Sequence, residues 1–184
     1  MGFYDTVEEL KNLNPDFISV TSGAGGSESN PETTKIASII KNNYGIESVV
    51  HLPCINLNKK DVLEILDEFK KVGIKNILAL RGDINLKFTP SDDFTYASDL
   101  ISFIKEKGDF NVIGACYPEG HVQCPTIIED IRYLKNKVDA GANQLITQLF
   151  FDNNYFYSFR ERASMAGIDI PITAGIMPAV HKKQ

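Results

Sequence analysis

The chain contains 184 residues, a length that suits one domain with a substantial core. Its net charge is −5 and it has no long basic run, which argues against nucleic acid as a partner. No apolar stretch approaches the roughly 20 residues that cross a bilayer, and the stretch MGFYDTVEEL lacks the regions of a signal peptide. We therefore expect a cytoplasmic protein that binds neither membranes nor nucleic acid.

Six short apolar runs, rich in β-branched residues, predict strands. In chain order they are FISV from Phe17, SVVHL from Ser48, NILAL from Asn76, NVIGAC from Asn111, QLITQLFF from Gln144 and PITAGI from Pro171. None alternates polar with apolar residues, which is typical of a parallel sheet covered on its faces.

Helical patterns fill the intervals between these runs. The first helix is expected from about Tyr4 to Leu13, and Asn30-Pro31-Glu32 predicts the start of the second. The third carries its apolar face on Val62, Ile65, Leu66 and Phe69 and ends at Gly73. The fourth is expected from about Asp93 to Lys107, with Tyr96, Leu100 and Ile104 pointing inward. PTIIEDIRYLKNKVDAG and NYFYSFRERASMAG predict two more, closed by Gly141 and Gly167.

Strict alternation of strand and helix indicates a parallel α/β fold, either an open doubly wound sheet or a (β/α)₈ barrel. Six strands are fewer than a barrel needs, but polar residues follow every strand, as they do on the active face of a barrel. The chain also opens on a helix and stops soon after a strand. We expect a partial (β/α)₈ barrel with about six of eight units, forming a single domain over residues 1–184.

The residues after the strands are the candidates for chemistry. They are Thr21 to Ser27, His51, Cys54, Arg81 to Asp83, Tyr117 to His121, Thr147, Gln148, Asp152, Pro178 and His181. In a barrel they converge on one rim. The glycine-rich stretch GAGGSE matches neither a Rossmann fingerprint nor a P-loop, so it is either a flexible turn or a close approach to a flat ligand.

Arg81-Gly82-Asp83 admits two interpretations, an adhesion tripeptide facing outward or a strand-end motif facing a reactive site. We favour the second, because Gly82 lets the chain turn and an acid in this place stabilises a developing cation. His51 and His121 are either structural or catalytic, and Tyr117 is either a packing residue or a stacking platform. Cys54, Cys116 and Cys124 form no C-x-x-C pair and no cluster with histidine, so we expect packing roles and no metal site.

Seven stretches together resemble the methylenetetrahydrofolate reductase family. They are DFISVTSGAGGS, HLPC, LALRGD, YASDL, CYPEGH, LKNKVDAGANQLITQLFFD and AGIMP. The resemblance implies a (β/α)₈ barrel that binds FAD noncovalently. It implies transfer of a hydride from NAD(P)H to 5,10-methylenetetrahydrofolate, which gives 5-methyltetrahydrofolate in the one-carbon metabolism that supplies methionine.

The resemblance also implies roles for individual residues. Along the flavin it places Thr21, Ser22, His51, Arg81, Gly82, Asp83 and Ala97. Along the rest of FAD it places Tyr117, His121, Cys124, Asp130, Tyr133, Asn136 and Lys137, with Lys137 opposite the pyrophosphate. Thr21 lies where nicotinamide stacks, Gln148 bonds folate and nicotinamide in turn, and Gln184 contacts folate. Ser22 stands where the family often has an aromatic residue.

Asp83 is the expected catalytic residue. Opening of the methylene bridge of the folate makes a 5-iminium cation, which a nearby carboxylate stabilises. The same charge opposes an anionic reduced flavin and so tunes its potential.

The family has a glutamate general acid in its first strand, and this chain shows no such stretch, since Glu28 lies in a later loop. We therefore expect a truncated form, lacking the first strand and the C-terminal units. The alternative is a non-catalytic flavin- and folate-binding remnant. A barrel lyase or aldolase is less favoured, because no lysine stands at a strand end. We expect a homo-oligomer or a complex with a partner subunit.

The isolated chain is accordingly predicted to be poorly stable and nearly inactive in folate reduction, because an open barrel exposes two strand edges. Adding a first strand and C-terminal units should restore both properties. The check is the unfolding midpoint and the turnover of the two polypeptides, and unchanged turnover on extension would contradict the prediction.

Overall fold

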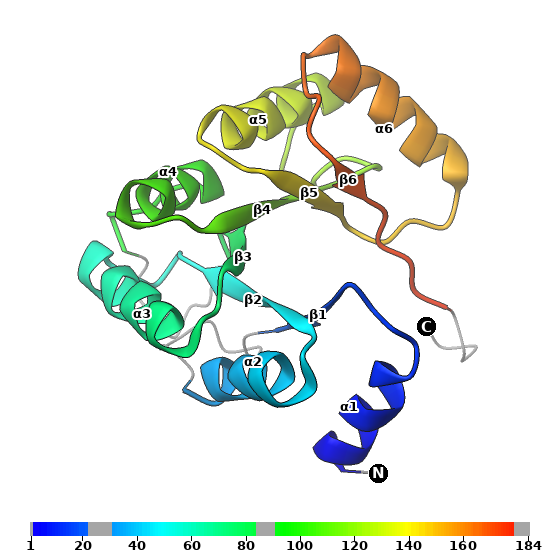
Figure 1. Cartoon of the computed structure of the whole chain (residues 1–184). Helices are drawn as coiled ribbons and strands as arrows, with labels where there is room; N and C mark the ends of the chain where they lie inside the picture. The colour runs from blue at the N-terminus through cyan, green and yellow to red at the C-terminus, as the bar shows by residue number, and fades with distance from the viewer. Residues whose placement is uncertain (1, 22–30, 84–90, 179–184) are drawn as a thin grey trace. The chain divides into compact units, whose positions relative to one another are not determined.

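The structure is a computed structural model that describes residues 2–21, 31–83 and 91–178. Within these ranges helices and strands alternate (Figure 1). The chain divides into two compact units, Met1–Val112 and Ile113–Gln184, and each is described by itself. The expectation of one domain over residues 1–184 stays a prediction.

In its described residues the first unit holds four helices and the first strands of the sheet. Its elements are α1 (Phe3–Lys11), β1 (Phe17–Val20), α2 (Pro31–Tyr44), β2 (Glu47–Pro53), α3 (Lys59–Val72), β3 (Asn76–Leu80) and α4 (Ala97–Lys107). The boundary between the units falls within β4 (Asn111–Cys116). The second unit continues with α5 (Ile127–Asp139), β5 (Gln144–Thr147), α6 (Asn153–Met165) and β6 (Ile172–Thr173).

The order of the strands decides the fold class. It is β1-β2-β3-β4-β5-β6, the order of the chain itself, and the pairs β1–β2, β2–β3, β4–β5 and β5–β6 are parallel. A doubly wound sheet reverses its strand order at a switch point, whereas a barrel does not. The predicted partial (β/α)₈ barrel is therefore confirmed.

Register gives the strands of the first unit two different faces. One face carries Val20, Val50 and Ile77, which are aligned in register and buried. Helix α2 packs against β1 and β2, and α4 packs against β3. The other face carries Ser19 on β1 and His51 on β2. This second face holds the polar side chains that matter for the site.

Helix α3 forms as its sequence predicts. Val62, Ile65, Leu66 and Phe69 are all buried, in agreement with the expected face. The Asn58 side chain accepts hydrogen bonds from the backbone N–H groups of Lys60 and Asp61 in the first turn of the helix. Gly73 ends the helix in the left-handed conformation, with φ of 78°.

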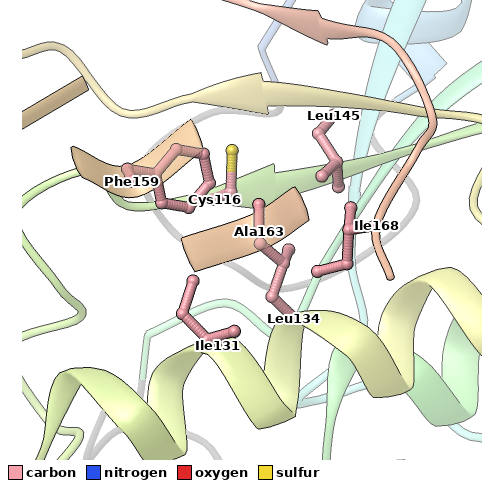
Figure 2. Packing of buried hydrophobic residues seen from close by; sticks show 7 residues of the cluster. All are labelled: Cys116, Ile131, Leu134, Leu145, Phe159, Ala163 and Ile168. Atoms are coloured by element: carbon pink, nitrogen blue, oxygen red, sulfur yellow. The ribbon is translucent and has the colours of Figure 1, made fainter. Parts of the chain in front are cut away.

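The core of the second unit lies between its strands and the two helices that follow (Figure 2). The cluster consists of Cys116, Ile131, Leu134, Leu145, Phe159, Ala163 and Ile168. Cys116 and Leu145 come from β4 and β5, while α5 and α6 supply Ile131, Leu134, Phe159 and Ala163. This packing fixes α5 against β4, which matters because α5 carries several predicted site residues.

Two strands are shorter than predicted. The run from Gln144 to Phe151 was expected to be one strand, but β5 stops at Thr147. Its partner β4 ends at Cys116, the residue paired with Thr147, so the ladder has no further partner. β6 covers only Ile172 and Thr173 of the predicted run, because its ladder with β5 is equally short.

The start of α4 also differs from the prediction. The helix begins at Ala97 rather than near Asp93, whose carboxylate instead accepts a hydrogen bond from the Lys59 N–H at 2.9 Å. Tyr96 was predicted to point inward, and this was wrong. It is the N-cap residue and 51% exposed, whereas Leu100 and Ile104 are buried as expected.

Candidate functional site

Ser19 and His51 form a side-chain pair on the polar face of the first unit. The Ser19 Oγ lies 2.7 Å from the His51 Nε2. His51 is half-buried, and this burial lowers the pKa of its imidazole below the ordinary value. The imidazole is therefore neutral at physiological pH. Thr21 follows Val20, the last residue of β1, and is exposed.

The predicted motif Arg81-Gly82-Asp83 follows directly on β3. The Arg81 carbonyl accepts a hydrogen bond from the Ile55 N–H at 2.8 Å, which continues the pairing beyond the end of the ladder. Arg81 is half-buried, and its Nε donates to the Gly82 carbonyl at 3.3 Å. Asp83 is exposed. That Asp83 faces a ligand stays a prediction.

Gly82 is the residue that this turn requires. Its φ is +87°, and a Cβ there would lie 3.0 Å from the Pro53 Cβ and 3.3 Å from the Ile55 Cγ2. Both the left-handed backbone and the closeness of Pro53 and Ile55 therefore disfavour a larger residue here.

Two further residues surround this strand end. Cys54 is fully buried, and burial raises the pKa of its thiol to about 12. Asp99 raises it further, while Arg81 opposes the shift, so both charges act on the thiol. Cys54 is thus buried as a packing residue, and its raised pKa disfavours the thiolate. Ala97, the first residue of α4, is buried.

Lys137 is the central cation of the second unit. Its stem passes Gly114, where a Cβ would lie 3.8 Å from the Lys137 Cδ. The ammonium donates to the Ala115 carbonyl at 2.8 Å and lies 5.8 Å from the centre of the Tyr117 ring. A charge from α5 is thereby held beside the end of β4.

The loop after β4 brings the predicted residues Tyr117 and His121 near this cation, and Asp130 of α5 joins them. The rings of Tyr117 and His121 meet edge to face, with centres 4.6 Å apart. The Gln123 N–H donates to the His121 Nδ1 at 3.1 Å, which makes this ring nitrogen a hydrogen-bond acceptor. The His121 N–H donates to the Asp130 carboxylate at 3.3 Å.

Asp130 is an acid whose environment favours its protonated form. Burial raises the pKa of this carboxyl, and the His121 backbone N–H, Lys137 and the His121 ring oppose the shift. Cys116, the last residue of β4, belongs to the hydrophobic core of the second unit, and burial raises the pKa of its thiol to about 12.

The remaining predicted residues are described by their own exposure and hydrogen bonds, apart from the group formed by Tyr117, His121, Asp130 and Lys137. Cys124 is half-buried, and its thiol contacts the Thr126 carbonyl at 3.3 Å. Tyr133 and Asn136 lie exposed on α5. Gln148 is exposed, and its N–H donates to the Cys116 carbonyl at 2.7 Å. Ser22, Glu28, His181 and Gln184 lie outside the described residues.

Ser19 is the site residue that the sequence did not reveal. It stands in an apolar run that was interpreted only as a strand. The serine inside FISV becomes informative once β1 and β2 are known to be neighbours, because the register places it on the face of His51.

Two classes of site find no support within the described residues. No group of three or more metal-binding side chains is found there, and no helix in these ranges is long and apolar enough to cross a bilayer.

The groups present suit a flavin dinucleotide. In the second unit, the cation Lys137 suits a phosphate and the carboxyl of Asp130 suits sugar hydroxyls. The aromatic ring of Tyr117 suits a flat ring.

The profile of the family described as methylenetetrahydrofolate reductase matches residues 1–184. The chain belongs to the methylenetetrahydrofolate reductase family. The predicted resemblance is therefore confirmed. The 5,10-methylenetetrahydrofolate reductases of Pectobacterium carotovorum subsp. carotovorum and of Escherichia coli K12 are each 40% identical over 181 residues, which cover 98% of this chain and 60% of theirs. Methylenetetrahydrofolate reductase 2 of Saccharomyces cerevisiae is 38% identical, over 96% of this chain and 31% of its own.

The chain thus spans 60% of the length of these bacterial relatives. Among solved structures, a phosphonopyruvate hydrolase has a TM-score of 0.67 at 12% identity, covering 93% of this chain and 71% of its own. The phosphoenolpyruvate phosphomutase of Streptomyces platensis subsp. rosaceus has a TM-score of 0.63 at 14% identity, with 91% and 72% covered. At these identities the likeness concerns the fold alone.

Replacement of Gly82 by alanine is predicted to destabilise the chain in two ways. The left-handed backbone costs about 1–2 kcal/mol, and the contact with Pro53 and Ile55 adds roughly 1–3 kcal/mol. Gly45→Ala is the matched control, because Gly45 has φ of +70° and open space around its Cβ position. Urea unfolding should show a larger loss for Gly82→Ala, and equal losses in the two variants would show that the neighbours yield.

Proposed function

We propose that the protein reduces 5,10-methylenetetrahydrofolate to 5-methyltetrahydrofolate in the cytoplasm, using NAD(P)H and bound FAD. Membership of the methylenetetrahydrofolate reductase family over residues 1–184 carries the proposal. The family name supplies the substrate and the reaction, and the polar groups after β3 and β4 supply chemistry that fits it. Bound FAD would supply the hydride-transfer chemistry that links the nicotinamide to the folate.

In the second unit, Lys137 would hold the pyrophosphate of FAD. Its stem is fixed along Gly114 and its ammonium by the Ala115 carbonyl, so little side-chain freedom is lost on binding. Asp130 would accept hydrogen bonds from sugar hydroxyls. The edge-to-face contact with His121 orients the Tyr117 ring as a platform for a flat group.

In the first unit, Asp83 would act electrostatically on the folate. Its place after Gly82, whose turn is fixed by Pro53 and Ile55, sets the direction in which the chain leaves β3. A carboxylate there stabilises the 5-iminium cation and disfavours extra electron density on the flavin. Arg81, Ala97, Ser22 and Thr21 would line the flavin, with Thr21 towards the nicotinamide.

The exposed Gln148 would bind the two substrates in turn. Its backbone is held by the Cys116 carbonyl at the end of β4, which leaves the side-chain amide to donate and accept hydrogen bonds. Alternate use of one amide by nicotinamide and folate agrees with a ping-pong reaction. Cys124, Tyr133 and Asn136 would extend the FAD surface of the second unit, and Gln184 would contact folate.

The polypeptide lengthened by a first strand and C-terminal units should test this proposal directly. It is expected to bind FAD and turn yellow, to bleach with NADH or NADPH, and to recolour when methylenetetrahydrofolate is added. Bleaching without recolouring would support a flavin-binding remnant in place of a reductase. A colourless preparation that takes up no added FAD would end the proposal.

Lys137→Met is predicted to weaken FAD binding by about 10- to 100-fold, because a charged hydrogen bond to phosphate contributes roughly 1.5–3 kcal/mol. Lys135→Met is the matched control, since Lys135 lies on the same helix and forms an ion pair with Asp139. Titration of the chain with FAD, followed by flavin fluorescence, gives the two affinities. Equal weakening in both variants would exclude a specific role for Lys137.

Asp83→Asn is predicted to slow recolouring by methylenetetrahydrofolate about 100-fold, the loss typical of one electrostatic group, while bleaching by NADH changes far less. It should also raise the midpoint potential of the bound flavin by about 30 mV, which for two electrons is about 1.4 kcal/mol. Asp109→Asn, at an exposed acid between α4 and β4, is the control. The folate step is followed in the lengthened polypeptide as well, and a loss confined to bleaching would contradict the assignment.

A further inference from the structure

Thr147 is a strand-end residue to which the proposed function gives no role. It is the last residue of β5 and is buried, although its side chain is polar. Its Oγ1 accepts a hydrogen bond from the Gly175 N–H at 2.8 Å. A backbone N–H can only donate, so the direction of this bond is fixed. The hydroxyl therefore ties the segment after β6 to the end of β5.

Gly175 approaches Thr147 closely because it has no side chain. The ladder between β5 and β6 ends with the pair of Ile146 and Thr173, two residues before Gly175. A Cβ on Gly175 would overlap the Thr147 carbonyl oxygen and lie 3.5 Å from the carbonyl carbon of Gln148. The Gly175 backbone thus lies directly against the peptide bond between Thr147 and Gln148, and any larger residue would push the segment away.

The backbone of Gln148 is thereby held from two sides. Its N–H donates to the Cys116 carbonyl of β4 at 2.7 Å, while Gly175 lies against its other side. Strands β4 and β6 are the two neighbours of β5 in the sheet, so each anchor comes from a different neighbour. The side chain of Gln148 is exposed. A fixed backbone therefore carries an amide that can turn.

An amide that serves two substrates in turn needs this arrangement. In the proposed function Gln148 bonds nicotinamide and folate alternately, so its side chain must reorient between them and cannot be locked by packing. The place of the amide then depends on the backbone. Precision matters here, because a misplacement of about 1 Å can cost about 100-fold in rate.

We infer that Thr147 is a positioning residue whose hydroxyl, through Gly175, holds the Gln148 backbone where one amide serves both substrates. The inference rests on the proposed function, since it deepens the role given there to Gln148. Thr147 and Gly175 act through Gln148 and contact neither substrate.

A purely structural role for the Thr147 hydroxyl predicts a different outcome. Loss of the hydroxyl would leave the Gly175 N–H without its acceptor and lower the free energy of unfolding, with no selective effect on either substrate. Positioning predicts weaker use of both substrates, an unchanged FAD affinity, and no further effect once the Gln148 amide has been removed.

The test compares Thr147→Val with Thr147→Ser in the lengthened polypeptide loaded with FAD. Valine keeps the shape and removes the acceptor, whereas serine keeps the acceptor. Thr147→Val should raise the concentrations of NADH and methylenetetrahydrofolate needed for half-maximal bleaching and recolouring by about two- to tenfold, the value of one neutral hydrogen bond. FAD affinity should stay unchanged, and Thr147→Ser should restore both concentrations. Thr147→Ala, which adds no bulk, should give the pattern of the valine variant.

Thr173→Val is the matched control. The Thr173 Oγ1 also accepts a hydrogen bond between β5 and β6, from the Gln144 Nε2 at 2.7 Å. Thr173 pairs with Ile146, so it lies on the face of the sheet opposite to Thr147. Its loss should leave bleaching and recolouring unchanged.

Two further measurements decide whether the effect passes through the proposed contacts. Hydrogen exchange at the Gly175 amide should be faster in Thr147→Val than in the wild type. In a Gln148→Ala background, Thr147→Val should cause no further loss with either substrate.

Unchanged exchange at Gly175 overturns the inference, as do unchanged half-maximal concentrations or an equal loss in the Gln148→Ala background. A wild-type polypeptide that neither bleaches nor recolours defeats the proposed function instead, and with it the role of Gln148. The exchange at Gly175 then still decides whether Thr147 holds the segment after β6.

Discussion

Register between neighbouring parallel strands is the constraint on which both sites depend. In the first unit, Pro53 pairs with Leu80, so the chains leaving β2 and β3 start side by side, and the Ile55 N–H bonds the Arg81 carbonyl one step later. In the second unit, Cys116 pairs with Thr147, and the Gln148 N–H bonds the Cys116 carbonyl. Each ladder is thus prolonged by backbone hydrogen bonds beyond its last pair, which hold the backbone of the predicted site residues even where their side chains are exposed.

Burial acts on the ionisable groups of both units in the direction of the neutral form. It lowers the pKa of His51 and raises that of Asp130. A raised folded-state pKa means that folding is favoured by the proton, so the contribution of Asp130 to stability falls as pH rises from its ordinary value of 3.8 through the folded value. The ionised carboxylate is therefore a cost at neutral pH, which the His121 N–H and Lys137 partly offset. A half-buried acid whose ionised form lowers the stability of the fold, placed beside a fixed cation, is typical of a binding site.

The sequence was sufficient for what depends on local pattern. The apolar face of α3 and its Gly73 end needed only spacing and residue type. The family motifs supplied the site residues that stay predictions. The ends of β5 and β6 could not be predicted, because each strand stops where its partner stops. Tyr96 was wrongly predicted for a similar reason, because the prediction started α4 near Asp93. The Asp93 carboxylate instead accepts a hydrogen bond from Lys59 at the start of α3, so α4 begins at Ala97 and Tyr96 is its N-cap residue. The pair of Ser19 and His51 required knowledge of register, which no single segment contains.

Exposure of Asp83 sets a condition on its proposed role. Two unit charges 4 Å apart interact by about 1 kcal/mol in bulk water and by about 4 kcal/mol at an effective dielectric constant of 20. A 100-fold effect on rate corresponds to about 2.7 kcal/mol, which the aqueous value does not reach. The carboxylate of an exposed Asp83 therefore reaches this strength only when a ligand displaces the water around it. Flat rings that cover the strand end would do so, and the fixed turn at Gly82 would keep the carboxylate in place while they bind.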